Sequence, residues 1–355
     1  MNFSGFDQAM MARALALAEK GLFTTTPNPR VGCVIAQGTT VVGEGWHEKA
    51  GGPHAEAMAF AQAGDRAAGA TAYVTLEPCN HHGRTPPCTE LLLRHKPARV
   101  VLAMRDPNPE AAGGIARLEA AGIRVDAGLM EDAARELNIG FVSRVTRGRP
   151  WVRMKIAATL DGRTALPDGR SQWITGPEAR QDGHRWRARA CAILTGIGTV
   201  KADDPRLTVR EVPTPRQPLR VVVDSRVETP EGAKVLQGGN TVLFAGAPFT
   251  RRIAADVVVL PNANGKVELP AMLDELGRRG INELHVEAGF RLNGSLVREG
   301  CVDEFLIYLN PSLLGDEAQG MVALARAASL DARTKLRLVS VERVGDDIRI
   351  LARTS

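Results

Sequence analysis

Apolar positions in the first half of the chain recur with two different spacings, which predict alternating helices and strands. Spacings of three or four residues are typical of helices, and short apolar runs between turn residues are typical of strands. Helices are therefore expected at residues 6–20, 55–63, 88–96 and near 109–121. Strands are expected at residues 30–36, 40–47, 70–77, 99–104 and 123–127, the first two as a hairpin around Gln37-Gly38. This alternation predicts a layered sheet with helices on both faces.

Strands dominate the pattern from Trp151 onward. Apolar runs predict strands at residues 152–157, 192–196, 219–224, 241–244, 257–260, 283–287 and 305–310, and a final hairpin of residues 335–344 and 347–352. Helices are expected at residues 177–190 and 270–280. This mixture predicts an open α/β sheet with an antiparallel edge. A basic stretch with Gly148 and Pro150 is the expected boundary, so we predict domains at residues 1–147 and 148–355.

Length and composition agree with two soluble α/β domains. A chain of 355 residues suggests about two domains, and 44% hydrophobic with 24% charged residues is ordinary for a globular protein. No apolar run is long enough for a transmembrane helix, and the first residues do not resemble a secretory signal, so no membrane association is expected. The five cysteines fit a reducing, cytoplasmic setting, with Cys33, Cys191 and Cys301 in apolar runs as core residues.

The charge pattern favours a small phosphorylated substrate over nucleic acid. The formal net charge is +5, but the basic residues are spread along the chain, and aromatic residues make up only 4% of it. Aromatic platforms for stacking single strands are therefore scarce. A modest positive excess instead suits the steering of phosphorylated small molecules.

Two motifs in the first half carry candidate metal chemistry. A His-Ala-Glu triplet at residues 54–56 is followed by Pro-Cys pairs at 78–79 and 87–88. Zinc prefers imidazole and thiolate, and a catalytic zinc site keeps three protein ligands and one open position for water. His-x-Glu followed by Pro-Cys-x-x-Cys is the signature of zinc deaminases. The sequence thus predicts that His54, Cys79 and Cys88 bind zinc and that Glu56 transfers protons.

The spacing of the two cysteines departs from that general signature. Eight residues separate Cys79 from Cys88 instead of two, although Gly83 and the Pro86-Pro87 pair suit a turn that brings both sulfurs to one ion. Cys88 is expected at a helix N-terminus, where the macrodipole favours a thiolate. A single His or Cys is more often a packed or exposed residue, so the prediction depends on the whole set.

Two glycine-containing loops follow apolar strands in the second half, Gly196-Ile197-Gly198 and Glu287-Ala288-Gly289. No Gly-x-Gly-x-x-Gly follows a strand there, so a standard Rossmann site is not supported. Ligands of open α/β sheets bind beyond the carboxyl ends of strands, where both loops are expected. A tight turn explains each of these loops equally well.

Longer motifs resemble one known family over nearly the whole chain. Residues 75–88 (Thr-Leu-Glu-Pro-Cys-Asn-His-His-Gly-Arg-Thr-Pro-Pro-Cys) and 27–34 (Pro-Asn-Pro-Arg-Val-Gly-Cys-Val) resemble the deaminase half of the bifunctional riboflavin-biosynthesis deaminase/reductase family, long intercysteine loop included. Asn80 stands where Ser is usual. Residues 155–163, 171–175, 199–210 and 287–289 resemble the reductase half of the same family, which usually continues the last loop with Pro or Gly rather than Phe290.

The resemblance implies a cytidine-deaminase-like three-layer domain followed by a dihydrofolate-reductase-like α/β domain. It implies a bifunctional enzyme with zinc and NADPH as cofactors. Such an enzyme deaminates a phosphoribosylamino-diaminopyrimidine hydrolytically and then reduces the ribosyl side chain to ribityl. It also implies a homo-oligomer, either a dimer or a tetramer.

The same likeness implies two sets of residues in the reductase half. The cofactor would contact Ala158, Trp173, Thr199, Asp203, Ser225 and Gly289. The substrate would contact Lys155, Ser171, Arg187, Leu207, Arg210 and Glu287. Arg187 and Arg210 could hold a phosphate with forked hydrogen bonds, and Lys155 could offer a cation to the sugar oxygen. Asp204 could polarise substrate hydroxyls or cap the turn before Pro205.

Two alternatives stay open on the sequence. One is a tRNA or nucleoside deaminase with a nucleic-acid-binding appendage, which would bind RNA in a salt-sensitive way. The other is a non-catalytic protein with a structural zinc, which a fourth protein ligand such as His81 or His82 would indicate.

Overall fold

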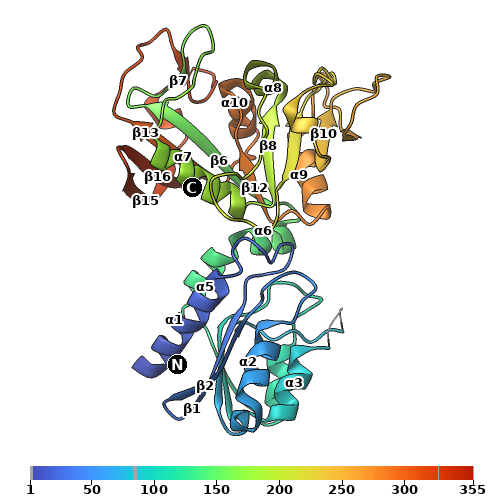
Figure 1. Cartoon of the computed structure of the whole chain (residues 1–355), viewed down its shortest axis with the longest axis vertical. Helices are drawn as coiled ribbons and strands as arrows, with labels where there is room; N and C mark the ends of the chain where they lie inside the picture. Colours follow the sequence, from blue (N-terminus) through green and yellow to red (C-terminus); the bar gives the residue numbers. More distant parts are fainter. Residues whose placement is uncertain (1–2, 83–85, 327, 355) are drawn as a thin grey trace. The chain divides into compact units, whose positions relative to one another are not determined.

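The computed structural model describes residues 3–82, 86–326 and 328–354. The chain divides into two compact units, Met1–Gly148 and Arg149–Ser355, each with its own sheet and core (Figure 1). Among the described residues, every helix falls short of the length and apolarity that crossing a membrane requires.

The first unit is built on a five-stranded sheet with the order β2-β1-β3-β4-β5. The strands are β1 (Gly32–Gln37), β2 (Thr40–Trp46), β3 (Thr71–Leu76), β4 (Arg99–Met104) and β5 (Arg124–Ala127). β1 is antiparallel to β2 and β3, whereas β3, β4 and β5 run parallel. The predicted hairpin and the three strands after it are confirmed.

Helices cover both faces of this sheet and complete a three-layer fold (Figure 1). One face is covered by α1 (Gly5–Glu19) and α5 (Glu131–Leu137), and α6 (Ile139–Arg147) ends the unit. The other face is covered by α2 (Ala55–Ala63), α3 (Cys88–His95) and α4 (Gly114–Ala120), with a 3-10 turn at Gly64–Ala67. The predicted three-layer α/β fold is therefore confirmed.

Two glycines of β2 allow the backbone of α2 to pack directly against the backbone of this strand. A Cβ atom at Gly43 would lie 2.2 Å from the carbonyl oxygen of Ala59, and one at Gly45 would lie 2.4 Å from that of Ala55. A side chain at either position would push the helix away from the strand. The backbone of β2 thus fixes the start of α2, which carries His54 and Glu56.

The loop after β4 differs from the expectation, because the helix predicted near residue 109 begins only at Gly114. Pro107 and Pro109 disfavour the helical region for the residues before them. Gly113 adopts a φ of +95°, which ends any helical continuity. The resulting loop places Asp106 and Asn108 in the wall of a cavity.

The second unit has a nine-stranded sheet with the order β11-β10-β9-β8-β12-β6-β13-β16-β15. Its strands are β6 (Trp151–Thr159), β8 (Ala192–Gly196), β9 (Leu219–Val223), β10 (Thr241–Ala245), β11 (Asp256–Val259), β12 (Glu283–Val286), β13 (Glu304–Asn310), β15 (Leu336–Val344) and β16 (Asp347–Thr354). In this order, the strands from β11 to β13 all run parallel to one another. β16 is antiparallel to β13, and β15 is antiparallel to β16. The predicted open sheet with an antiparallel edge is confirmed.

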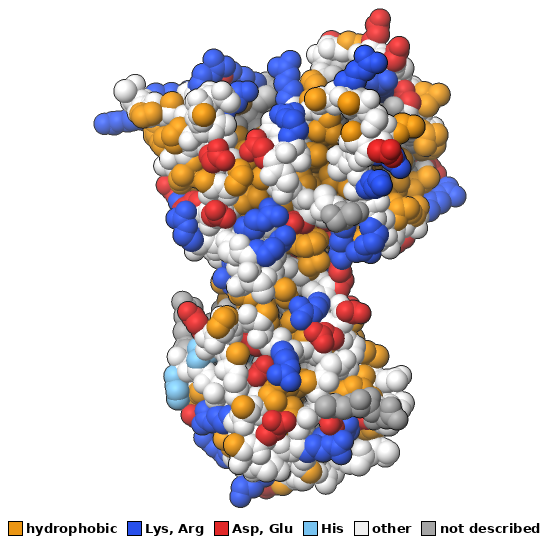
Figure 2. Space-filling model, turned by 180° about the vertical axis from the view of Figure 1, so that it is seen from behind, with side chains coloured by type: hydrophobic (Ala, Val, Ile, Leu, Met, Phe, Trp, Pro, Cys, Tyr) orange, Lys and Arg blue, Asp and Glu red, His pale blue; other side chains and the backbone are white. Residues whose placement is uncertain are grey.

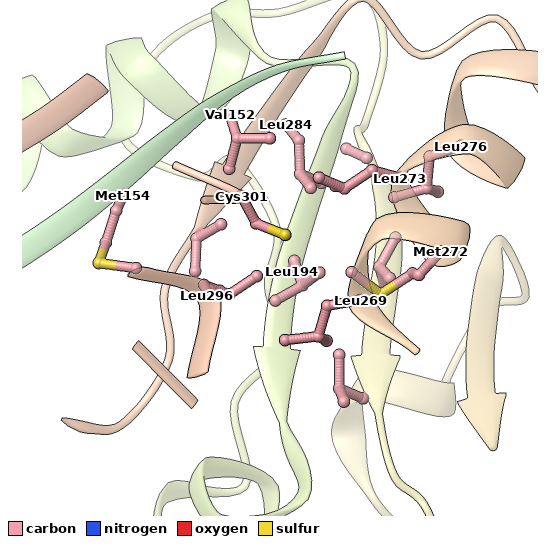
Figure 3. Packing of buried hydrophobic residues seen from close by; sticks show 14 of the residues in the cluster. Val152, Met154, Leu194, Leu269, Met272, Leu273, Leu276, Leu284, Leu296 and Cys301 are labelled. Atoms are coloured by element: carbon pink, nitrogen blue, oxygen red, sulfur yellow. The ribbon is translucent and has the colours of Figure 1, made fainter. Parts of the chain in front are cut away.

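Helices lie on both faces of the second sheet as well. α9 (Leu269–Arg278) and α10 (Phe290–Arg298) enclose the main core with Leu194 and Leu284, as Figure 3 shows for Met272, Leu273 and Leu296. The opposite face is covered by α7 (Pro177–Arg189) and α8 (Ile197–Asp203). A small ribbon pairs β7 (Arg163–Ala165) with β14 (Gln319–Gly320), and 3-10 turns lie at Lys234–Leu236 and Leu330–Ala332.

Candidate functional site

Three elements of the first unit bring the predicted metal ligands together. His54 is the N-cap residue of α2, and its side chain makes no capping hydrogen bond. Cys79 follows the end of β3, and Cys88 is the first residue of α3. The candidate ligand atoms of the three residues lie within 4.8 Å of one another. Residues 83–85 of the intercysteine loop, including the predicted turn residue Gly83, lie outside the described residues.

Short contacts link the three ligands. The distance from His54 Nδ1 is 3.2 Å to Cys88 Sγ and 3.6 Å to Cys79 Sγ. The backbone N–H of Cys88 donates to Cys79 Sγ over 3.3 Å. One imidazole and two sulfurs at these separations are a donor set that zinc prefers, and they fit a shared ion.

Contacts between the two cysteines shift the pKa values of their thiols in opposite directions. Hydrogen bonds from the Cys88 thiol, the His54 ring and the Cys88 N–H lower the pKa of the Cys79 thiol to about 4. The hydrogen bond to Cys79 and burial raise the pKa of Cys88 well above its ordinary value. Because zinc binding requires both cysteines as thiolates, the expected thiolate at Cys88 stays a prediction.

Glu56 lies in the first turn of α2 and is only 3% exposed. Burial raises the pKa of its carboxyl group. Glu56, His54 and Cys79 all line a cavity of about 450 Å³ formed by residues of the first unit. A carboxylate beside the metal ligands, facing a cavity of ligand size, is the arrangement that proton transfer to a bound substrate requires.

The sequence did not predict that His47 and Asn28 form a hydrogen-bonded group beside His54. His47 Nδ1 donates to the Pro53 carbonyl oxygen over 2.9 Å, and Asn28 Nδ2 lies 3.0 Å from His47 Nε2. Burial lowers the pKa of His47, in agreement with a neutral ring. The His47 and His54 rings meet edge to face at 5.4 Å, so this hydrogen-bonded group fixes the wall next to the metal ligand.

Asp106 is a second cavity residue that the sequence did not reveal. Its carboxyl group has a pKa raised to about 6, chiefly by burial. Glu77 ties the surrounding loops together, since its carboxylate accepts from the N–H groups of Asp106 and Ile115 over 3.2 and 3.0 Å. The sequence signal available for this loop was its pair of prolines, Pro107 and Pro109, whereas we expected a helix from about residue 109.

The alternative of a closed, structural zinc site requires a fourth protein ligand. Within the described part of the chain, the candidate ligand group has three members, His54, Cys79 and Cys88. His82, proposed as a fourth ligand, lies 3.2 Å from Glu90, and His81 lines the cavity. An open coordination position is what a catalytic site keeps.

A larger cavity of about 1390 Å³ lies at the carboxyl ends of the parallel strands in the second unit. It is bounded by the loop after β8 and the loop after β12, two neighbouring strands at which the strand order reverses. Such a switch point is the usual ligand site of open α/β sheets. A Cβ atom at Gly198 would meet no atom within 4 Å, so a cofactor can approach this backbone closely. The cavity therefore fits a dinucleotide and a substrate.

Of the twelve residues that the resemblance placed in this half, eleven line the cavity. They are Lys155, Ser171, Trp173, Arg187, Thr199, Asp203, Leu207, Arg210, Ser225, Glu287 and Gly289. Ala158 instead is fully buried in the hydrophobic core of the unit. Its side chain points into the core cluster because alternate residues of β6 face opposite sides of the sheet.

Arg187 and Glu287 form a forked ion pair in the cavity wall, with 2.7 Å between Arg187 Nη2 and Glu287 Oε2. Burial alone would raise the pKa of Glu287, but Arg187 holds it well below the ordinary value. Burial lowers the pKa of Lys155 in the same wall. Because Glu287 occupies the guanidinium group of Arg187, Arg210 is the more available of these two arginines for binding an anion.

His184 of α7 holds the Arg210 segment. The Arg210 backbone N–H donates to His184 Nδ1 over 3.2 Å, and Arg187 Nη1 donates to the Thr208 carbonyl oxygen over 3.1 Å. Burial lowers the pKa of His184 to about 4. Asp204 is also explained: its carboxylate accepts from the Lys234 N–H over 2.8 Å, which favours a structural role.

Family comparisons cover both units. Residues 4–104 match the cytidine and deoxycytidylate deaminase zinc-binding region, and residues 150–350 match the RibD C-terminal domain. The riboflavin biosynthesis protein RibD of Escherichia coli strain K12 is 45% identical over 358 residues, covering 96% of this chain and 98% of that protein. RibD of Aquifex aeolicus is 42% identical, with 97% of each chain covered.

Solved structures show the same likeness. Acinetobacter baumannii RibD is 41% identical with a TM-score of 0.92, and the match covers 99% of each chain. A diaminohydroxyphosphoribosylaminopyrimidine deaminase/5-amino-6-(5-phosphoribosylamino)uracil reductase from Thermotoga maritima is 32% identical with a TM-score of 0.89 and equal coverage. The chain therefore belongs to the RibD family of riboflavin biosynthesis, as a bifunctional enzyme with a zinc-binding deaminase domain and a reductase domain.

Proposed function

We propose that the deaminase domain, residues 1–147, hydrolyses the exocyclic amine of a diaminopyrimidine that carries a phosphoribosylamino group. The reductase domain, residues 148–355, then reduces the ribosyl side chain to ribityl with NADPH. The observation that carries this proposal is the convergence of His54, Cys79 and Cys88 within 4.8 Å, beside the buried Glu56. The names of the full-length relatives support the same two reactions.

In the first cavity, the residues of the chain supply binding and proton transfer. Zinc held by His54, Cys79 and Cys88 supplies the Lewis acidity that activates water. Glu56 takes a proton from the attacking water and delivers it to the leaving amine. Burial raises the pKa of Glu56 and so helps it to hold the proton between these two events. The polar wall at Asn28 and Asp106 orients the pyrimidine.

In the second cavity, a fixed set of charges orients the sugar phosphate. NADPH supplies the hydride. Lys155 places its ammonium group against the sugar oxygen that gains negative charge, and Glu287 holds Lys155 and Arg187 by charge. Arg210, which is exposed and anchored through His184, binds the phosphate. Ser171 and Leu207 border the substrate, and Trp173, Thr199, Asp203, Ser225 and Gly289 border the cofactor.

Surface charge, the thiol ligands and an exposed edge strand support the proposed substrate class, compartment and oligomeric state. Lys and Arg side chains are interspersed with Asp and Glu on the face that Figure 2 shows, which suits a small substrate better than a nucleic acid. Two thiol ligands require reducing conditions, which favours the cytoplasm. The edge strand β15 exposes Leu338 and Val341, which supports a homo-oligomer, either a dimer or a tetramer.

Replacing Glu56 with Ala tests this assignment. Ammonia release should fall roughly 10²–10⁴-fold, because the proton shuttle is lost. Zinc content should stay at one ion per chain, and NADPH oxidation with the deaminated substrate should persist. The matched control is Glu48→Ala, which removes an exposed carboxylate from the loop before α2. Equal loss of both activities in Glu56→Ala would contradict two separable sites.

A further inference from the structure

The residues that follow the two cysteine ligands are hydrogen-bonded to each other. Asn80 follows Cys79, and Thr89 follows Cys88. The Thr89 hydroxyl donates to Asn80 Oδ1 over 3.0 Å, and the Thr89 backbone N–H donates to the Cys79 carbonyl oxygen over 3.3 Å. Thr89 is fully buried, so these bonds are shielded from water. They join the segment after β3 to the start of α3 without using either sulfur.

Arg117 of α4 binds both of these residues. Its Nη1 atom donates to Asn80 Oδ1 over 2.8 Å and to Thr89 Oγ1 over 3.2 Å. Its Nη2 atom lies 3.6 Å from Glu90 Oε1 in the first turn of α3. Because the guanidinium group is planar and rigid, contacts through two nitrogens fix its orientation. The three side chains of Arg117, Asn80 and Thr89, called here the Arg117 cluster, therefore form a closed ring of hydrogen bonds.

The start of α4 holds the Cys79 segment from the same side. A Cβ atom at Gly114 would lie 2.1 Å from the Pro78 carbonyl oxygen, so only glycine lets the helix begin this close to the segment. The Asn80 backbone N–H donates to the Ala111 carbonyl oxygen over 3.0 Å. The backbone on both sides of Cys79 thus lies directly against the turn that begins α4.

Asn80 is also a position at which this chain differs from its family, where Ser is usual. The amide oxygen of Asn lies one bond farther from the backbone than a Ser hydroxyl, which extends the acceptor toward Arg117. Among the described residues that line the first cavity, Arg117, Asn80 and Thr89 do not occur. A role of the Arg117 cluster in the site therefore acts through the metal ligands and not through contact with substrate.

We propose that Arg117 is a positioning residue of the zinc site, which holds Cys79 and Cys88 ready for one ion through Asn80 and Thr89. The inference deepens the proposed function, because it rests on the proposed zinc ligands. Residues behind metal ligands orient them, and losing such a residue typically lowers metal affinity roughly 10–100-fold. Without Arg117, the two ligand segments lose the side chain that binds both, and zinc binding itself has to order them.

The test measures zinc affinity of the full-length protein by competition with a chromogenic chelator. The absorption spectrum of the Co²⁺-substituted protein reports the geometry of the sulfur ligands. Arg117→Ala should weaken zinc binding roughly 10–100-fold and shift the cobalt bands. Arg117→Lys, which keeps the charge and one donor, should lose less affinity. Asn80→Ala should also weaken binding, and the double variant Asn80→Ala/Arg117→Ala should lose less than the sum of the two single losses, because both remove one shared hydrogen bond.

Arg94→Ala is the matched control, because it removes an equal charge from an exposed position of α3. It should leave zinc affinity and the cobalt spectrum unchanged. Circular dichroism and NADPH oxidation verify folding, and Arg117→Lys and Asn80→Ala carry the test if Arg117→Ala does not fold.

Additive losses in the double variant, or zinc affinity within about twofold of wild type in Arg117→Ala and Asn80→Ala, would overturn the role of Arg117 and leave the zinc ligands intact. An equal loss in Arg94→Ala would reduce the effect to one of net charge. If the wild-type protein binds no zinc, the proposed ligand set itself is wrong.

Discussion

Glu56 and Glu287 show how neighbours give one residue type two opposite tasks. Burial raises the pKa of Glu56, whereas Arg187 holds the pKa of Glu287 well below its ordinary value. A carboxyl group of the first kind can carry a proton, and one of the second kind stays charged. These opposite shifts support the proposed roles, with Glu56 as the proton carrier of the first cavity and Glu287 as the anion that positions two cations in the second.

Glu287→Gln should damage the reductase half alone. The substitution leaves Arg187 partly buried without its carboxylate, so the free energy of unfolding of this domain should fall by roughly 3–5 kcal/mol. Because the folded pKa of Glu287 is depressed, its stabilisation is present above the unfolded pKa of about 4.3 and is lost as the pH falls through the folded pKa. The stability gap between wild type and Glu287→Gln should therefore narrow below about pH 4.

Urea unfolding at several pH values, followed by circular dichroism, measures this gap. Ammonia release should be unchanged in Glu287→Gln, and NADPH oxidation should drop. Glu317→Gln, an exposed carboxylate of the same unit, serves as the control and should show no pH-dependent gap. A gap that stays constant from pH 7 to pH 3 would contradict the depressed pKa.

Site residues could be predicted from the sequence where they belong to a short motif. His54, Cys79, Cys88 and Glu56 belong to short motifs, and proline and strand signals placed them near one point. Asp106 and His47 were not recognised as cavity residues, because only the folded loops bring them to the metal ligands. Ala158 stays a prediction: its side chain lies in the core, so a contact with the cofactor would have to come from its backbone.

The contact between α2 and β2 determines how well the metal ligands are held. Gly45→Ala would place a methyl group 2.4 Å from the Ala55 carbonyl oxygen, and main chain cannot move aside as a flexible side chain can. We expect a loss of stability of about 1–3 kcal/mol and weaker zinc binding, because His54 caps the displaced helix.

Zinc affinity by competition with a chelator and thermal unfolding measure the two effects. Gly5→Ala is the control, since a Cβ atom at this first residue of α1 meets nothing within 4 Å. Unchanged zinc affinity in Gly45→Ala would show that the helix tolerates displacement without moving its N-cap residue.

Elements with long periodic patterns were predictable, and so were the short helices α2 and α3, which begin just after a proline; other short helices were not. α1 and the strands of both sheets follow their expected ranges closely. α5, α6, α8 and α10 are nine residues long or shorter, too short to display a clear helical period. Tertiary contacts against the sheets, rather than intrinsic propensity, stabilise helices of this length.

The edge of the second sheet carries the prediction for self-association. Leu338 is 63% exposed and Val341 is 57% exposed on β15, and an apolar edge strand invites pairing with another chain. The double substitution of both residues by Lys should shift the mass in light scattering to that of a 38.0 kDa monomer. Leu330→Lys, at an 83% exposed position outside the sheet, should leave the mass unchanged. A mass that is the same in all three proteins would place the interface elsewhere.

Two α/β domains could be anticipated from chain length and from the alternation of helices and strands, and the fold of each unit is confirmed. The strand order of the second sheet could not be, because β12 enters between β8 and β6 after three strands have been added on the far side. Such an insertion depends on long-range pairing, which periodicity does not encode.

The difference in size between the two cavities, about 450 and 1390 Å³, has a kinetic consequence. A chamber that holds reductant and sugar phosphate side by side lets both reactants be present before any product departs. When the concentrations of NADPH and of the sugar phosphate are both varied, double-reciprocal plots of the initial velocity of the reductase step should give intersecting lines. Parallel lines would mean that a product leaves before the second reactant binds. The smaller chamber takes a single organic reactant, so the first step should follow a simple hyperbola.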